Sequence, residues 1–408
     1  MAILTDTTAE QRQPSTGAVL EVDDLNVRFP TEDGVVHAVR GVTFSLRPGE
    51  VLGIVGESGS GKSVTSMAVM GLLPSSANIT GSVKFRGREL LGLGDVQMSA
   101  VRGKSVAMVF QDPMTSLDPV YKIGNQIAET VRQHDKSVSR AGAKARAVDL
   151  LKLVGIPNAA DRVSAYPHEF SGGMRQRVVI AIAIANQPEV IIADEPTTAL
   201  DVTVQAQVLE VLKTAQDETG AATVLITHDL GVVAGMVDRV LVMYAGRAVE
   251  KGTVDDVFYR PRMPYSIGLL GSMPRIDAGD RRRLTPIKGA PPSLINPPPG
   301  CPFGPRCPLH YAKCDEQEPD LLPVDGVDHS AACIRVDELV ETDVAPEDIF
   351  TADSSDATLA AAAAIGESAL SEQGVGDAAA AATGGVPTEP PPIPGAQSDA
   401  RRDQEDRA

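Results

Sequence analysis

The feature that most constrains this chain is the glycine-rich stretch at residues 51–63, VLGIVGESGSGKS. Its first residues are mainly apolar and predict a short buried strand, and a helix is expected to begin at Lys62-Ser63. The loop between them fits G-x-x-x-x-G-K-S, whose backbone N–H groups can surround a polyphosphate at a helix N-terminus. A flexible Gly/Ser turn would explain the composition of the loop. It would not explain why a predicted strand ends and a predicted helix begins at the positions that the motif requires. The stretch therefore predicts a site for a nucleoside triphosphate.

Each position of this phosphate loop has a chemical role in the prediction. The ammonium group of Lys62 would reach the β- and γ-phosphates, and the hydroxyl of Ser63 would be a ligand for Mg²⁺. The glycines let the backbone turn inward around the phosphates. The other residues expected to form the cradle are Gly56, Ser58, Gly59, Ser60 and Gly61.

Polar residues end three other predicted strands. They are Gln111, Asp194, Glu195 and His228. In an open α/β sheet, ligands lie at the carboxyl ends of the strands, so we expect these side chains near the phosphate loop. Asp194 would hold the Mg²⁺ shell through water, and Glu195 is a candidate base for the attacking water. Gln111 could contact Mg²⁺ or that water, and His228 the γ-phosphate. Taken singly, each could instead be a structural or solvated residue.

Two further stretches are candidates for contacts to a nucleotide. Ser171, Gly172 and Gly173 come directly before a predicted helix over 175–185, and a helix N-terminus favours an anion. This second anion site has no lysine, so it could complete a phosphate pocket supplied by another subunit. Phe29 ends a predicted strand ahead of the phosphate loop, where it could stack on an adenine ring or fill the core.

The net charge of the 408-residue chain, −17, comes mainly from its end. Residues 337–408 include 16 acidic and 3 basic residues and carry −13, which leaves residues 1–336 at −4. With no basic stripe and no tryptophan, the sequence does not favour a nucleic-acid partner. It contains no uninterrupted run of 18 apolar residues, so it predicts no membrane span, and residues 1–17 lack the pattern of a secretory signal.

All four cysteines fall in one short region. They are Cys301, Cys307, Cys314 and Cys333. Four thiolates can hold either tetrahedral Zn²⁺ or an iron–sulfur cluster, whereas a disulfide framework suits a small secreted domain. The spacing is not that of a zinc ribbon, which weakens the case for zinc, and free thiols are the third alternative. Such a site would staple a proline-rich segment that is too poor in apolar residues to fold alone.

In their order and spacing, these motifs resemble the ATP-binding subunit of an ABC transporter over about residues 18–265. The resemblance implies an α/β fold of the P-loop NTPase class, with a RecA-like α/β core, an antiparallel β subdomain and a helical subdomain over about 115–185. It also implies that ATP is held between two such domains, the phosphate loop of one facing the Ser-Gly-Gly of the other. Met174 departs from the family's usual Gln, but the phosphate contacts come from Ser171 and backbone N–H groups, so we expect activity to survive.

The same resemblance implies roles for individual residues. Glu195 polarises the attacking water, and His228 contacts the γ-phosphate. Phe29 lies where the family has its adenine-stacking aromatic residue. Asp201, in the pair Leu200-Asp201, lies at the seam between the two domains.

A finer resemblance, to the oligopeptide/dipeptide importer ATPases, rests on GESGSGKS, QDPMTSLDP and the region after residue 260. That region reads RMPYSIGLLGSMP and then IKGAPPSLINPPPGCPFGPRCP. The resemblance favours a [4Fe-4S] cluster at the four cysteines. It implies two membrane permease subunits contacted through residues 113–120, a second ATPase subunit that is more often a different chain, and an extracytoplasmic solute-binding protein. The chain would then work at the cytoplasmic face of the cell membrane.

We therefore expect four regions. They are a disordered N-terminus (1–17), the ATPase domain (18–265), an extension with the four-cysteine site (266–336) and a disordered acidic tail rich in Ala and Pro (337–408). The function expected is that of the ATP-hydrolysing motor of a peptide importer. Alternatives are import of nickel or another small solute, and a soluble ABC ATPase acting on DNA or ribosomes. The single cassette without a long heptad run disfavours the latter, and the lack of a membrane span disfavours an exporter half.

Overall fold

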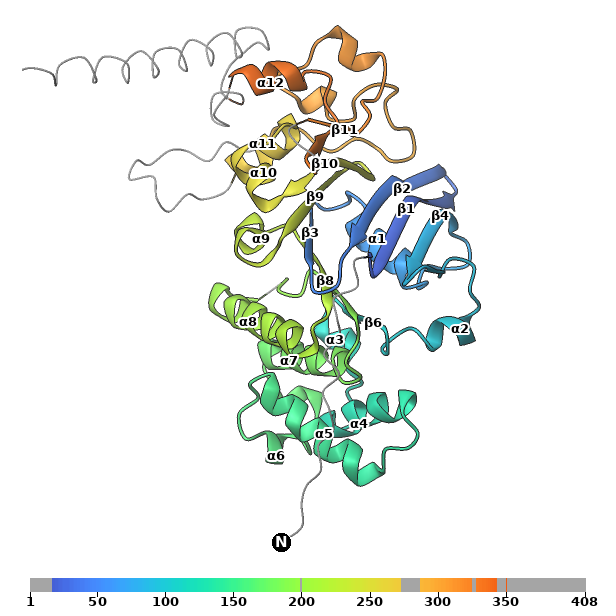
Figure 1. Cartoon of the computed structure of the whole chain (residues 1–408), viewed down its shortest axis with the longest axis vertical. Coiled ribbons are helices and arrows are strands. Elements are labelled where there is room, and N and C mark those ends of the chain that lie inside the picture. Colours follow the sequence, from blue (N-terminus) through green and yellow to red (C-terminus); the bar gives the residue numbers. More distant parts are fainter. Residues whose placement is uncertain (1–16, 199, 273–286, 325–327, 343–349, 351–408) are drawn as a thin grey trace, which may run out of the picture. The chain divides into compact units, whose positions relative to one another are not determined.

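The computed structural model of the chain describes residues 17–198, 200–272, 287–324, 328–342 and 350. Two β-sheets organise these residues (Figure 1). The smaller sheet has the strand order β2-β1-β4-β5, and the larger has the order β11-β12-β10-β9-β3-β8-β7-β6. The predicted α/β class, with an added antiparallel sheet, is confirmed.

The smaller sheet is antiparallel and is built from two hairpins. Its strands are β1 (Leu20–Thr31), β2 (Gly34–Leu46), β4 (Asn78–Phe85) and β5 (Arg88–Glu89). The first hairpin closes where Thr31 pairs with Gly34. The second turns at Arg86-Gly87, where both residues have positive φ (49° and 76°), as a type I′ hairpin turn requires.

Most of the larger sheet is parallel, so its strand carboxyl ends share one edge. Its strands are β3 (Val51–Val55), β6 (Val106–Val109), β7 (Val190–Asp194), β8 (Ala222–Thr227), β9 (Arg239–Tyr244), β10 (Arg247–Thr253), β11 (Leu322–Pro323) and β12 (Ser330–Ala331). β3 lies between β8 and β9 and is parallel to both. The phosphate loop therefore leaves the sheet from a central strand.

In the described part of the chain, helices follow strands along the sequence. The bounds of these helices are α1 (Lys62–Val69), α2 (Asp95–Ser99), α3 (Pro113–Ser116), α4 (Ile123–His134), α5 (Arg140–Leu153), α6 (Ala159–Arg162), α7 (Gly172–Ala183), α8 (Val202–Thr219), α9 (Leu230–Met236), α10 (Val254–Tyr259), α11 (Pro264–Gly271) and α12 (Val336–Thr342). The helices α3 to α7 come between β6 and β7 in the sequence. Short 3₁₀ turns occur at Pro167–Glu169, Gly304–Arg306 and Ala312–Asp315. No helix in the described ranges is long and apolar enough to cross a membrane.

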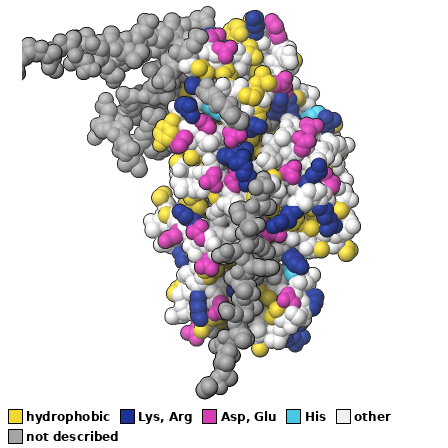
Figure 2. All heavy atoms as spheres, viewed as in Figure 1, with side chains coloured by type: hydrophobic (Ala, Val, Ile, Leu, Met, Phe, Trp, Pro, Cys, Tyr) yellow, Lys and Arg dark blue, Asp and Glu magenta, His cyan; other side chains and the backbone are white. Residues whose placement is uncertain are grey.

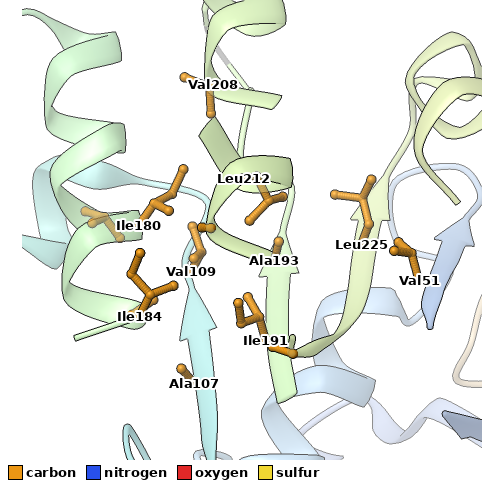
Figure 3. Close-up of a cluster of buried hydrophobic side chains, with 14 of the residues drawn as sticks. Val51, Ala107, Val109, Ile180, Ile184, Ile191, Ala193, Val208, Leu212 and Leu225 are labelled. Carbon is orange, nitrogen blue, oxygen red and sulfur yellow. The ribbon is translucent and has the colours of Figure 1, made fainter. Parts of the chain in front are cut away.

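The larger sheet is covered on both faces, and alternate residues of each central strand enter different cores. In β7, Ile191 and Ala193 belong to one buried apolar cluster, and Val190 and Ile192 to another. Figure 3 shows the first cluster, in which side chains of β6, β7 and β8 point toward those of α7 and α8. A strand buried on both faces is expected to be continuously apolar, which explains the run Val190–Ala193.

One predicted boundary is wrong. We expected the disordered tail to start at residue 337, but residues 337–342 belong to α12. The reason is packing, because Leu339 is buried in a small apolar cluster with Ile267 and Leu309. The predicted disorder over residues 1–16, and over the tail beyond residue 342 except Phe350, falls outside the described residues.

Candidate nucleotide-binding and catalytic site

The phosphate loop adopts a conformation that only glycine permits at two positions. Gly56 and Gly61 have φ values of 148° and 101°. A Cβ atom at Gly56 would lie 2.2 Å from the carbonyl oxygen of Met243, and one at Gly61 would lie 2.5 Å from that of Ala38. The backbones of neighbouring strands thus leave no space for a side chain at either position, so the fold requires both glycines of the sequence pattern.

Lys62 is buried at the start of α1, with its ammonium group turned back over the loop. The group donates hydrogen bonds to the carbonyl oxygens of Gly56 (2.8 Å) and Glu57 (2.9 Å). Burial lowers the pKa of Lys62, and the carboxylates of Glu195 and Asp194 oppose that shift. A buried cation on an inward-turned loop at a helix N-terminus is suited to bind a polyphosphate.

Ser63 and Asp194 bring two hard oxygen donors together beside the loop. The hydroxyl of Ser63 donates a 2.9 Å hydrogen bond to Oδ1 of Asp194, which ends β7. Asp194 is only 3% exposed, and burial raises its pKa, while the bond from Ser63 opposes the shift. A buried carboxylate next to a hydroxyl fits Mg²⁺, which takes few protein ligands and completes its shell with water and phosphate oxygens.

Glu195 brings three of the predicted catalytic residues together. Its Oε2 accepts hydrogen bonds from Nε2 of Gln111 (3.1 Å) and from the hydroxyl of Thr198 (2.8 Å). Nδ1 of His228 lies 3.5 Å from the same oxygen. Glu195 has a φ of 45°, unusual for a residue other than glycine, and such backbone strain often marks a functional position. Sequence reasoning did not identify Thr198, because a threonine in a loop carries no distinctive pattern.

A cavity of about 680 Å³ lies over the phosphate loop and contains most of the predicted nucleotide contacts. The predicted residues that line it are Phe29, Ser58, Gly59, Gly61, Lys62, Ser63, Gln111, Glu195 and His228. Phe29 also packs at the edge of an apolar cluster, so the two alternatives considered for it are compatible. The cavity has an apolar wall and a polar, charged end, as a nucleotide requires.

The Ser-Gly-Gly residues and Asp201 lie elsewhere, at two adjoining helix N-termini. The hydroxyl of Ser171 caps α7, and the carboxylate of Asp201 caps α8. The two helices are in close contact, because a Cβ atom at Gly173 would lie 2.3 Å from Cγ1 of Val204. None of these residues lines the cavity over the phosphate loop.

Sequence reasoning did not identify a strong contact between the phosphate loop and the C-terminal extension. The guanidinium group of Arg306 binds both carboxylate oxygens of Glu57, at 2.8 and 3.0 Å. The backbone N–H of Glu57 also donates a 2.8 Å hydrogen bond to the hydroxyl of Tyr265. The one available signal was the acidic residue itself, Glu57, in a loop otherwise made of Gly, Ser and Lys.

The four cysteines line one cavity in the extension, together with Phe303 and Leu309. None is in a disulfide. Burial raises the pKa values of Cys301, Cys307 and Cys333, that of Cys333 to about 12. The four thiols lie around one cavity, as the sequence predicts. Within the described ranges, however, no three His, Cys, Asp or Glu side chains are arranged to hold a metal ion. The donor set, four thiols around one cavity, has the chemistry of a zinc or iron–sulfur site.

The glycine-rich loop, the buried aspartate and the adjoining glutamate on a mainly parallel sheet define a P-loop nucleotide-binding domain. Residues 39–198 match the family model for the ABC transporter, and residues 249–314 match the model for the oligopeptide/dipeptide transporter, C-terminal region. The chain belongs to the ATP-binding proteins of oligopeptide and dipeptide ABC transporters.

Individual relatives agree with the family models. The dipeptide transport ATP-binding protein DppD of Bacillus subtilis is 51% identical over 325 residues, which are 79% of this chain and 96% of that protein. The oligopeptide transport ATP-binding protein OppD of Mycobacterium bovis is 59% identical over 319 residues, 78% of this chain but only 52% of that protein. This chain therefore spans about half the length of the mycobacterial relative.

Solved structures support the same fold. A dimeric ATP-binding cassette in a post-hydrolysis state, bound to ADP and Pi, aligns with a TM-score of 0.52 and 25% identity, covering 58% of this chain and 98% of that one. The cbiO1 protein of Clostridium perfringens, part of an ABC transporter complex, aligns with a TM-score of 0.51 and 28% identity, over 60% of this chain and 91% of that one.

Proposed function

We propose that this chain is the ATP-hydrolysing motor subunit of an ABC importer that takes up oligopeptides or dipeptides across the cytoplasmic membrane. The observation that carries the proposal is Glu195, held by Gln111 and Thr198 at the edge of the phosphate-loop cavity. The names of the relatives and the match over residues 249–314 support peptides as the cargo over nickel or another small solute.

In the proposed reaction, the loop N–H groups and Lys62 bind the β- and γ-phosphates. Ser63, and Asp194 through water, would hold Mg²⁺, which would neutralise charge on the phosphate oxygens. Glu195 orients a water and accepts its proton as the water oxygen attacks the γ-phosphorus and the bond to the β-phosphate oxygen breaks. Gln111 and Thr198 keep the accepting carboxylate in place, since both donate to its Oε2. ADP and phosphate are the products.

A complete site would need a second ATPase subunit, and we propose a different chain in that role. Ser171 and Asp201 cap the N-termini of α7 and α8, Gly172 and Gly173 begin α7, and none of the four lines the phosphate-loop cavity. Their backbone N–H groups are suited to bind the γ-phosphate held by a facing subunit. The solved cassette with bound ADP and Pi is itself a dimer, which supports this arrangement.

We propose that two membrane permease subunits bind the segment after Gln111, around residues 113–120, and that an extracytoplasmic solute-binding protein delivers the peptide. The segment exposes apolar side chains, with Met114 61% and Val120 71% exposed. Large exposed apolar side chains of this kind suit a protein partner. The chain would then be peripheral, at the cytoplasmic face of the membrane.

No nucleic-acid partner is part of the proposal. On the face drawn in Figure 2, acidic and basic side chains of the described residues are interspersed. A protein that binds nucleic acid typically gathers its Lys and Arg side chains on one face.

For the four-cysteine site we propose a [4Fe-4S] cluster, with Zn²⁺ as the alternative. The support is the convergence of Cys301, Cys307, Cys314 and Cys333 on one cavity. Either group would need deprotonated thiols and would staple the proline-rich extension. Iron, acid-labile sulfide and zinc contents of anaerobically purified chain distinguish the two, and a chain without any of them would contradict both.

The function is tested with the chain assembled in its transporter in lipid vesicles. We expect Glu195→Gln to bind ATP with ordinary affinity, to hold the two ATPase subunits together, and to lose ATP turnover and peptide uptake. The wild-type complex and one carrying Lys62→Ala, which should fail to bind ATP, are the controls. Undiminished turnover by Glu195→Gln would remove Glu195 from the role of base. ATP turnover that no peptide stimulates, without uptake of labelled peptide, would remove the peptide cargo.

A further inference from the structure

We propose that the C-terminal extension forms part of the nucleotide pocket, with Leu294 contacting the base of the bound nucleotide. Leu294 would then be a determinant of ATP affinity. This inference rests on the proposed nucleotide site and adds to it a contact from outside the ATPase domain.

The composition of the cavity places the base at one end. Lys62, Ser63 and Glu195 form its polar end, so the phosphates and the ion belong there. The apolar side chains of the lining are those of Phe29, Val36, Ala38, Val64 and Leu294, and Val64 belongs to α1, next to Ser63. A purine base has two apolar faces, so it is the part of the nucleotide that this wall can accommodate. Three of these residues come from the β1–β2 hairpin, whereas Leu294 comes from the extension.

Leu294 is held against the hairpin by a hydrogen bond from the backbone and by the packing of the next side chain, Ile295. Its carbonyl oxygen accepts a 2.9 Å hydrogen bond from the N–H of His37, the residue between Val36 and Ala38. The next residue, Ile295, fits against Gly34, where a Cβ atom would lie 2.9 Å from its Cγ2. The position of Leu294 in the wall is therefore fixed by the fold.

Arg306 acts as a positioning residue that links this segment to the phosphate loop. Its Nε donates a 3.1 Å hydrogen bond to the carbonyl oxygen of Lys288, while its two terminal nitrogens bind Glu57. The guanidinium side chain is only 6% exposed. One buried group thus fixes both the start of the segment that presents Leu294 and the loop that binds the phosphates.

The test uses the purified full-length chain with Mg²⁺ and two probes, ATP and inorganic tripolyphosphate, which has no base. We expect Leu294→Ala to weaken ATP binding by about tenfold. This is the low end of the loss in affinity that follows removal of an apolar contact, because the side chain of Leu294 is only half-buried. Binding of tripolyphosphate should not change. In ATP hydrolysis, measured with the chain assembled in its transporter, the KM should rise while kcat stays the same. Leu294→Met, which keeps an apolar side chain, should bind ATP with the wild-type affinity.

Leu322→Ala is the matched control, because Leu322 is an exposed leucine of the same extension that does not line the cavity. It should leave the binding of both probes unchanged. Leu294→Ala with normal ATP affinity would overturn the inference. So would an equal loss for ATP and tripolyphosphate, which would indicate a displaced phosphate loop. Lys62→Ala tests the nucleotide site separately from the contact of Leu294 with the base. If that variant still bound both probes normally, the nucleotide site itself would be wrongly assigned.

Discussion

Replacing Arg306 by methionine should destabilise the folded chain far more than losing an ordinary surface charge. The side chain of Arg306 is 6% exposed and that of its partner Glu57 is 25% exposed. Removing one member of a fully buried pair costs about 3–5 kcal/mol, and an exposed pair contributes about 0–1 kcal/mol. Since Glu57 retains some contact with water, we expect a loss of about 2–4 kcal/mol in the free energy of unfolding.

The assay is the thermal unfolding midpoint, followed by calorimetry. With an unfolding entropy of about 2.1 cal/mol/K per residue, a domain of about 300 residues loses roughly 1.6 °C for each kcal/mol, so Arg306→Met should lower the midpoint by about 3–6 °C. Arg86→Met is the matched control, because Arg86 also pairs with a glutamate, Glu189, but its side chain is 50% exposed. The control should change the midpoint by less than about 1.6 °C.

A double-mutant cycle with Glu57→Gln isolates the ion pair, because Arg306 also contacts Tyr244 and Lys288. The combined variant should lose less stability than the sum of the two single losses, since each single change already breaks the pair. Equal midpoint losses for Arg306→Met and Arg86→Met, or strict additivity in the cycle, would refute the view that this pair joins the extension to the phosphate loop.

Two further predictions concern the catalytic end of the cavity. Burial raises the pKa of Asp194, so its charged form opposes folding, and the Mg²⁺-free protein should gain stability as pH falls through the raised pKa. Asp194→Asn should therefore raise the unfolding midpoint of the Mg²⁺-free protein at neutral pH. The variant should also lose the rise in midpoint that Mg²⁺ with ATP causes in the wild type, and an unchanged rise would contradict this. His228→Ala should slow turnover at saturating ATP by about 10²-fold while ATP affinity is kept, and normal turnover would exclude a contact to the γ-phosphate.

The parts of the site that follow from local patterns were predictable from the sequence. The phosphate loop is a contiguous motif, and Gln111, Asp194 and His228 follow apolar strands, so the geometry of a parallel sheet brings them to one edge. Their separate chemical roles are still predictions. The resemblance to importer ATPases also predicted the family correctly.

Contacts between distant segments were not predictable. Glu57 and Arg306 are 249 positions apart, and no periodicity connects them. Leu294 lies in a proline-rich stretch that has neither a helical nor a strand pattern, so its place in the cavity depends entirely on tertiary packing. The start of the tail was misplaced for a related reason, because the short helix α12 is stabilised by burial of Leu339 and not by its composition.

The tight contact between Gly173 and Val204 has a mechanical consequence. Because the side chain of Val204 lies so close to the backbone of Gly173 that a methyl group would not fit between them, α7 cannot slide along α8 without carrying it. Ser171 and Asp201, which cap the two helices, must then move as one rigid edge. If a facing subunit binds this edge as proposed, it would therefore meet both caps in the same step.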